Sequence, residues 1–406
     1  MLSPYRVLDL SDEEGILCGK ILGDLGADVI AIEPLKGSPA RLVGPFYHDE
    51  PDPEKSLFWF AYATSKRGIT LDIETDDGRD IFKRLVKKTD IIVESFHPGY
   101  LESIGLGYDE LEKVNPGVIL VRITPFGQTG PYKDYKGPDI VVWGMGGQMA
   151  PFGEPDRPPF RISYYSQAYL NAGADGALTA LLAIIQRAST GLGQQIDVSA
   201  HEAAVNCTEH ITSGWDLRHA MQKRDGGAGQ RLTRLWPCKD GYVSWFYWGG
   251  VMSLRTNVPL IKWMQEEGMA DAFTVNYDWA HFSGPNTSQA DIDHIEALTG
   301  KFFLAHTKDE LFEGALKRNV QVYPVSTPAD MLKDPQLIYR QFWVELEHTE
   351  LGVKLPYPGA FAATDVAPPV PSRRAPLIGE HNMEVYEKEL GITREQLVVL
   401  KEAGVI

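Results

Sequence analysis

The turn DLSDEEG, residues 9–15, carries three consecutive carboxylates, at Asp12, Glu13 and Glu14. The apolar run before it predicts a strand and the run after it predicts a helix, so this is the first strand-to-helix turn. Phosphate-binding turns in this position present glycines and bare backbone amides. Three carboxylates would repel a diphosphate. A structural interpretation is also open, because Ser11 and Glu14 have capping-box spacing and acidic side chains favour a helix N-terminus.

Basic side chains that could meet an anionic ligand are scattered along the chain. The candidates are Arg41, Lys66, Arg67, Lys133, Lys136 and Arg161. We expect each to be a solvated surface charge, as most Lys and Arg residues are.

The sequence does not predict a metal site. His201 and Glu202 begin an HExxH-like pattern, but Val205 stands where the second histidine is needed. The three cysteines, Cys18, Cys207 and Cys238, fit neither a disulfide framework nor zinc-ligand spacing, so we expect buried free thiols. No G-x-S-x-G, Walker or G-x-G-x-x-G motif is present.

Strands and helices alternate through the first part of the chain. Strands are predicted over residues 5–10, 27–33, 68–73, 90–96 and 118–124, with helices over 15–26, 77–89 and 108–114. Strand, helix, strand within about 30 residues is typical of a βαβ unit and a parallel sheet. The sequence therefore predicts an α/β fold with an open, doubly wound sheet.

The pattern changes in the second half. A glycine-rich stretch at 224–231 precedes two β-like runs around an Asp240-Gly241 turn, and a proline-rich linker at 364–376 precedes a final amphipathic helix at 393–404. We divide the chain into a large domain at 1–225, a small domain at 230–330, and a linker with a C-terminal return to the large domain at 331–406.

The net charge of the chain disfavours some classes of binding partner. With 55 acidic and 39 basic residues the formal charge is -16, which disfavours nucleic acid and anionic membrane surfaces. The N-terminus lacks the pattern of a signal peptide, and the longest apolar run, residues 177–185, is shorter than a membrane span. We expect a cytoplasmic protein.

The order of several segments resembles that of the family III CoA-transferases (the CaiB/BaiF type). The matching segments are VLDL, LGDLGADVIAIEP, SKRGITLDI, DIIVESFHPGYLESIGLGYDELEKVNPGVILVRITPFGQTGPY, TGLGQQIDVSAHEAA, VYPVSTPADMLKDPQL and APLIGEHNMEV. The resemblance implies a Rossmann-like large domain made from both chain ends, a small inserted α+β domain, and a dimer of interlocked subunits. It also implies a CoA thioester as substrate and no covalently bound cofactor.

In this family an aspartate four residues before the glycine of a DxxxG element attacks the acyl carbon of a CoA thioester. Here the element reads YLNAG, which places Tyr169 at the nucleophile position before Gly173, just after Tyr164 and Tyr165. Ionising a phenol of pKa about 10 at pH 7 costs roughly 4 kcal/mol, whereas a carboxyl of pKa about 4 is already ionised. Asp175 should lie inside the following helix and cannot replace the nucleophile. We therefore expect no catalytic residue in this chain.

The positions that contact CoA in the family are only partly kept. Leu71, Phe96 and Lys136 match family contacts, whereas Ser103 and Glu74 stand where the family often carries a basic residue. Together with the acidic first turn, these departures predict weak CoA binding.

The sequence thus resembles the non-catalytic subunit of a heteromeric CoA-transferase whose sister subunit carries the aspartate. One such pair in the family acts in anaerobic aromatic degradation, and that resemblance makes (R)-benzylsuccinate and succinyl-CoA the candidate substrates. Two alternatives stay open. One is an active acyl-CoA racemase, isomerase or lyase that uses Tyr169 or a histidine in acid–base catalysis. The other is a homodimeric regulatory protein.

Overall fold

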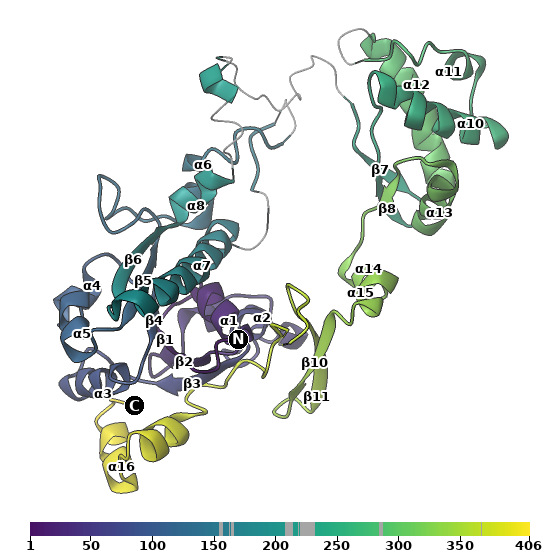
Figure 1. Cartoon of the computed structure of the whole chain (residues 1–406). Coiled ribbons are helices and arrows are strands. Elements are labelled where there is room, and N and C mark those ends of the chain that lie inside the picture. The colour runs from purple at the N-terminus through teal and green to yellow at the C-terminus, as the bar shows by residue number, and fades with distance from the viewer. Residues whose placement is uncertain are drawn as a thin grey trace. The chain divides into compact units, whose positions relative to one another are not determined.

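The computed structural model describes residues 1–153, 157–161, 163, 166–207, 214–217, 219, 232–283, 287–366 and 368–406. Tyr164, Tyr165 and the glycine-rich stretch 224–231 lie outside the described residues. The chain forms two compact units (Figure 1). The first comprises Met1–Ala150, Phe160–Leu217 and Ile338–Ile406, and the second comprises Pro151–Pro159 and Arg218–Leu337.

A six-stranded parallel sheet organises the first unit, in the order β3-β2-β1-β4-β5-β6. The strands are β1 (Arg6–Asp9), β2 (Asp28–Glu33), β3 (Lys66–Thr70), β4 (Ile91–Glu94), β5 (Ile119–Thr124) and β6 (Gln194–Ser199). The predicted parallel α/β sheet is confirmed. Strand β3 ends three residues earlier than predicted, and β6, at an edge of the sheet, was not predicted.

Helices cover both faces of this sheet (Figure 1). The helices of the first unit are α1 (Ile16–Asp24), η1 (Pro39–Leu42), η2 (Tyr47–Asp49), α2 (Leu57–Tyr62), α3 (Asp76–Val86), α4 (Tyr100–Ser103), α5 (Tyr108–Val114), α6 (Asp139–Met145), α7 (Gln167–Thr190), α8 (Ala200–Asn206), η4 (Met383–Glu389) and α16 (Arg394–Glu402). Adjacent residues of β1 point to opposite faces: Val7 packs in the core with α1 and α7, and Leu8 packs in the core with α3, α5 and α16.

The C-terminal segment lies along β3. Tyr386 donates its hydroxyl proton to the Thr70 carbonyl at 2.6 Å, and the His381 backbone amide donates to Gly68 at 2.9 Å. Earlier in this segment, β10 (Trp343–His348) and β11 (Val353–Pro358) form an antiparallel hairpin that was not predicted.

The second unit has its own aromatic core, which includes Trp236, Trp245, Trp263 and Trp279. Its elements are β7 (Leu235–Cys238), β8 (Gly241–Ser244), η3 (Ser253–Asn257), α10 (Val258–Glu266), α11 (Ala272–Val275), α12 (Gln289–Ala305), α13 (Lys308–Arg318), β9 (Tyr323–Pro324) and α14 (Pro328–Met331); α15 (Pro335–Tyr339) follows at the boundary. The predicted hairpin at Asp240-Gly241 is confirmed, with β7 antiparallel to β8.

Helix α7 is the one described helix that is long and apolar enough to span a membrane by length and composition. Half of its most apolar window is buried within this chain, against α1, α6, α8 and the strands β5 and β6. A core helix meets the same criteria, and the packing supports that interpretation.

Candidate functional site

A cavity of about 480 Å³ opens at the carboxyl ends of β1 to β4, where the strand order reverses. Ligands of open α/β sheets bind at this place in the fold. Its lining is Leu10, Ser11, Asp12, Ile32, Glu33, Pro34, Leu35, Ser38, Pro39, Leu71, Asp72, Ile73, Glu74, Ser95, Phe96 and Tyr100. Apolar side chains form much of the wall, and among the residues described no Lys or Arg lines it.

Two of the three predicted CoA contacts, Leu71 and Phe96, lie together in this cavity. Phe96 is held by its backbone amide, which donates to the Glu94 carboxylate at 2.6 Å. Glu94 also accepts a bond from Arg122 at 2.7 Å, and Arg122 binds Glu102 on α4 through two nitrogens, at 2.7 and 3.0 Å. Burial raises the pKa of Glu94 to about 7, although Arg122 opposes the shift. The buried ion pair therefore positions Phe96.

The third predicted contact, Lys136, is exposed and does not line the cavity. It immediately precedes Gly137, whose carbonyl faces the Tyr169 hydroxyl. Glu74, by contrast, lines the cavity and accepts a hydrogen bond from the Tyr100 hydroxyl at 2.9 Å. Where the family often has a basic residue, this chain places a carboxylate at the cavity rim.

Three of the basic candidates are neither ligand-facing nor solvated. Arg41, Lys66 and Arg67 are buried in ion pairs with carboxylates of the same unit, so the prediction of solvated surface charges is wrong for them. Lys133 pairs with its neighbour Asp134. One cysteine prediction is also wrong, because Cys207 is exposed.

The predicted capping box at the first turn does not form. Helix α1 begins at Ile16, its N-cap residue Gly15 makes no side-chain cap, and Ser11 instead donates its hydroxyl proton to Asp9 at 2.5 Å. Asp9 is also the buried partner of Lys66, at 2.7 Å. This charged pair draws Ser11 away from the helix start, because a hydrogen bond to an ionised group is stronger than one to a backbone amide.

Tyr169 lies in the first turn of α7 and is 3% exposed. Its hydroxyl donates to the Gly137 carbonyl. One turn later α7 crosses α1 so closely that a Cβ on Gly173 would lie 3.0 Å from the Leu17 side chain. The Asp139 carboxylate accepts a bond from the Ala168 amide at 2.8 Å and so fixes the start of α7. Tyr169 is therefore a closely packed residue.

The crossing of α1 and α7 brings Glu14 close to the Tyr169 hydroxyl, so that each group shifts the pKa of the other. Burial, and then the charge of Asp12, raise the pKa of Glu14 to about 8. Burial and the charge of Glu14 raise the pKa of Tyr169 above its usual value. The hydroxyl therefore stays protonated at neutral pH.

Asp175 does not face this site. It lies mid-helix on α7, and its charge acts on Cys207 at the end of α8. The prediction that it lies within the helix is confirmed.

Sequence reasoning missed two parts of the site. One is the cap that Asp139 gives to α7, which joins residues 29 positions apart and has no local signal. The other is the proximity of Glu14 to Tyr169. No local sequence pattern predicts it, because the two residues are far apart in the sequence.

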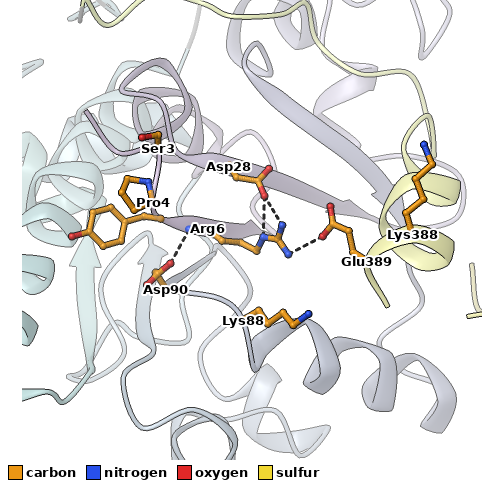
Figure 2. Close-up of a pocket in the computed structure, with 9 residues that line it drawn as sticks. Ser3, Pro4, Arg6, Asp28, Lys88, Asp90, Lys388 and Glu389 are labelled. Carbon is orange, nitrogen blue, oxygen red and sulfur yellow. Dashed lines mark hydrogen bonds and ion pairs between the residues drawn. The ribbon is translucent and has the colours of Figure 1, made fainter. Parts of the chain in front are cut away.

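A second cavity, of about 520 Å³, lies at the opposite edge of the same sheet. Figure 2 shows Arg6 paired there with Asp28 and with Glu389, at 2.7 and 2.8 Å. The Asp90 carboxylate accepts a hydrogen bond from the Arg6 backbone amide at 2.8 Å and forms an ion pair with Arg187 at 2.7 Å. Each carboxylate that lines this second cavity thus has an arginine partner, which indicates a structural role.

A Rossmann-like sheet with a cavity at its strand-order reversal defines the class of open, doubly wound α/β proteins, which bind their ligands at this place. Residues 2–382 match the family model of CoA-transferase family III, and the chain belongs to that family. The resemblance seen in the sequence is thereby confirmed, and the chain is an enzyme subunit or enzyme of the CoA-transferase class.

Particular relatives sharpen this assignment. The chain is 34% identical to succinyl-CoA:(R)-benzylsuccinate CoA-transferase subunit BbsE of Thauera aromatica, over 94% of this chain and 93% of the relative. It is 32% identical to succinyl-CoA–D-citramalate CoA-transferase of Chloroflexus aurantiacus, over 100% and 98%. The crystal structure of a CaiB/BaiF family protein from Brucella suis superposes with a TM-score of 0.82 at 29% identity and covers 95% of this chain and 98% of its own.

Proposed function

We propose that this chain is the catalytically silent subunit of a heteromeric CoA-transferase, and that a sister subunit of the same family supplies the aspartate nucleophile. The observation that carries the proposal is the state of Tyr169. Its hydroxyl is buried, donates to the Gly137 carbonyl, lies near Glu14, and has a raised pKa. A protonated, hydrogen-bonded phenol is a poor nucleophile toward a thioester.

The charge of the site supports the same proposal. Asp12, Asp72 and Glu74 line the cavity, and none of them forms an ion pair with a described residue. CoA carries a diphosphate and a further phosphate, so these carboxylates oppose its entry. In this proposal Leu71 and Phe96 line the cavity but do not bind CoA, and Lys136 does not bind CoA either.

The relatives' names indicate the substrate class. Both name succinyl-CoA as donor, and both acceptors, (R)-benzylsuccinate and D-citramalate, are substituted succinic acids. We propose that the complex moves CoA from succinyl-CoA to a substituted succinate, with (R)-benzylsuccinate as the first candidate, in the cytoplasm during anaerobic aromatic degradation.

The proposed assembly is a dimer of interlocked subunits, with the large domain built from both chain ends and the small domain inserted. It is supported by a relative that is itself a subunit. It is also supported by an apolar row on α7, where Leu178, Leu182 and Ile185 are each more than half exposed, at 56%, 56% and 67%. Such a row on a soluble protein indicates a protein partner.

The test is to co-express the tagged chain with a family III chain that retains DxxxG. Co-purification of the two as a dimer, about twice 45.1 kDa by light scattering, and transfer of CoA from succinyl-CoA to (R)-benzylsuccinate only by the pair would support the proposal. Turnover by this chain alone would contradict it and favour an active racemase, isomerase or lyase.

A further inference from the structure

The second cavity, of about 520 Å³, lies at the amino edge of the sheet, where the strands begin, and most of its lining is charged (Figure 2). Apart from Ser3, Pro4 and Tyr5, every residue that lines it carries a charge. Its volume falls within the range of small-molecule sites. Because charged walls do not favour an apolar ligand, the cavity suits a small polar or charged one.

Each oxygen of the three carboxylates in this lining already contacts a donor of the same chain. Both oxygens of Asp28 accept hydrogen bonds from Arg67, at 2.9 and 2.7 Å, and one also accepts from Arg6 at 2.9 Å. Glu389 pairs through one oxygen with Arg67 at 2.5 Å and through the other with Arg6 at 2.8 Å. The two oxygens of Asp90 bind an arginine side chain and a backbone amide. The carboxylates therefore do not require a cation from a ligand.

The donors of this cavity, by contrast, are not all used. Nε and Nη2 of Arg6 bind Asp28, and Nη1 binds Glu389. A guanidinium has five N–H groups and each of these contacts uses one, so two N–H groups of Arg6 have no partner among the residues described. Lys88 and Lys388 also line the cavity, near Glu389 (Figure 2), and no ion pair or hydrogen bond joins either lysine to a described residue. The cavity thus presents unpaired cations beside neutralised carboxylates.

We propose that this cavity binds a small dianion, with the charge of a dicarboxylate or a phosphate, between the ammonium groups of Lys88 and Lys388 and the remaining N–H groups of Arg6. Two negative charges are favoured over one because each lysine then gains a counter-charge. A guanidinium and two ammonium groups are the usual donors to carboxylate and phosphate oxygens. These residues have no part in the silent-subunit proposal, so either proposal can fail without the other.

The first experiment is calorimetric titration of the full chain with succinate, inorganic phosphate and acetate at low salt. Succinate or phosphate should bind at least about tenfold more tightly than the monoanion acetate, and the affinity should fall as salt screens the lysines. Tighter binding of succinate would assign the cavity to dicarboxylates, and tighter binding of phosphate would assign it to phosphates. If neither dianion binds up to millimolar concentration, or if acetate binds equally well, the proposal is overturned.

Lysine variants locate the binding. Lys88→Met/Lys388→Met should weaken binding of the dianion at least about tenfold, because it removes both unpaired ammonium groups. The matched control is Lys87→Met/Lys401→Met, which removes the same charge from exposed positions that do not line the cavity. The control should change the affinity by less than about threefold, because solvent and salt screen distant charges. Unchanged affinity in the cavity variant, or an equal loss in the control, would overturn the proposal.

Discussion

Carboxylates lie in different surroundings at the amino edge of the six-stranded sheet, where its strands begin, and at the carboxyl edge, where they end. At the amino edge, Asp28, Asp90 and Glu389 line a cavity and each pairs with an arginine (Figure 2). At the carboxyl edge, Glu33 pairs with Arg41, but Asp12 and Glu74 line the same cavity, of similar size, and no ion pair joins either to a described residue.

We infer that the carboxylates paired with arginine stabilise the fold, and that the carboxylates without an ion pair determine which ligands the cavity accepts. Asp12 is half-buried and Glu74 is exposed, so neither needs a cation for the chain to fold, and their charge can act on a ligand in the cavity. The predictions below test that separation, from the largest expected effect to the smallest.

Removing a cation from the amino edge should destabilise the fold most. Arg67 is buried and binds Asp28, Glu384 and Glu389, so Arg67→Met leaves these carboxylates without their shared cation. We expect a loss of about 2–3 kcal/mol in the free energy of unfolding, below the loss for a fully buried pair because the carboxylates are partly solvated. Denaturant unfolding measures it. The control Lys388→Met, at an exposed lysine of the same cavity, should change stability by under about 0.5 kcal/mol; equal losses in the two variants would erase the distinction.

Removing negative charge from the carboxyl edge should instead strengthen CoA binding. Asp12→Asn/Glu74→Gln replaces two carboxylates that line the cavity and should strengthen CoA binding by more than about tenfold, or about 1.4 kcal/mol. Calorimetry compares it with the wild-type chain, which should bind CoA weakly. Micromolar CoA affinity in the wild type would show that the acidic turn does not exclude CoA.

Glu14 should make stability depend on pH. Its pKa is raised in the folded chain, from the usual 4.5 to about 8, so the stability it contributes is present at low pH and is lost as pH rises through 8. Glu14→Gln removes this loss. The variant should match wild type near pH 5 and exceed it by at least about 1 kcal/mol at pH 9, after allowance for partial exposure. Thermal unfolding at both pH values measures the difference. A pH-independent difference would mean that Glu14 is ionised throughout.

Tyr169→Phe should have the smallest effect. It removes one hydrogen bond, to Gly137, and leaves the ring packed, at a cost of about 1 kcal/mol in stability. Turnover of the heteromeric complex should stay within about threefold, whereas alanine in place of the sister subunit's aspartate should abolish it. A hundredfold fall in kcat for Tyr169→Phe would make this tyrosine catalytic.

The sequence predicted the parallel sheet, because apolar periodicity is local. It placed Tyr169 just ahead of a helix, whereas α7 begins at Gln167 and includes Tyr169 in its first turn. It did not predict that Lys66 is buried on Asp9, or that Glu14 contacts Tyr169, because these pairs join residues far apart in the chain. The capping-box prediction at Ser11 was wrong for the same reason, since the buried ion pair competes for the hydroxyl.

The most direct test of the silent-subunit account is to find where the covalent intermediate forms. The complex is mixed with succinyl-CoA, quenched in acid, digested and analysed by mass spectrometry for acyl or CoA adducts. The account predicts an adduct on the sister subunit's aspartate and none on the peptide that contains Tyr169 or the peptide that contains Glu14. An adduct on either residue of this chain would contradict it.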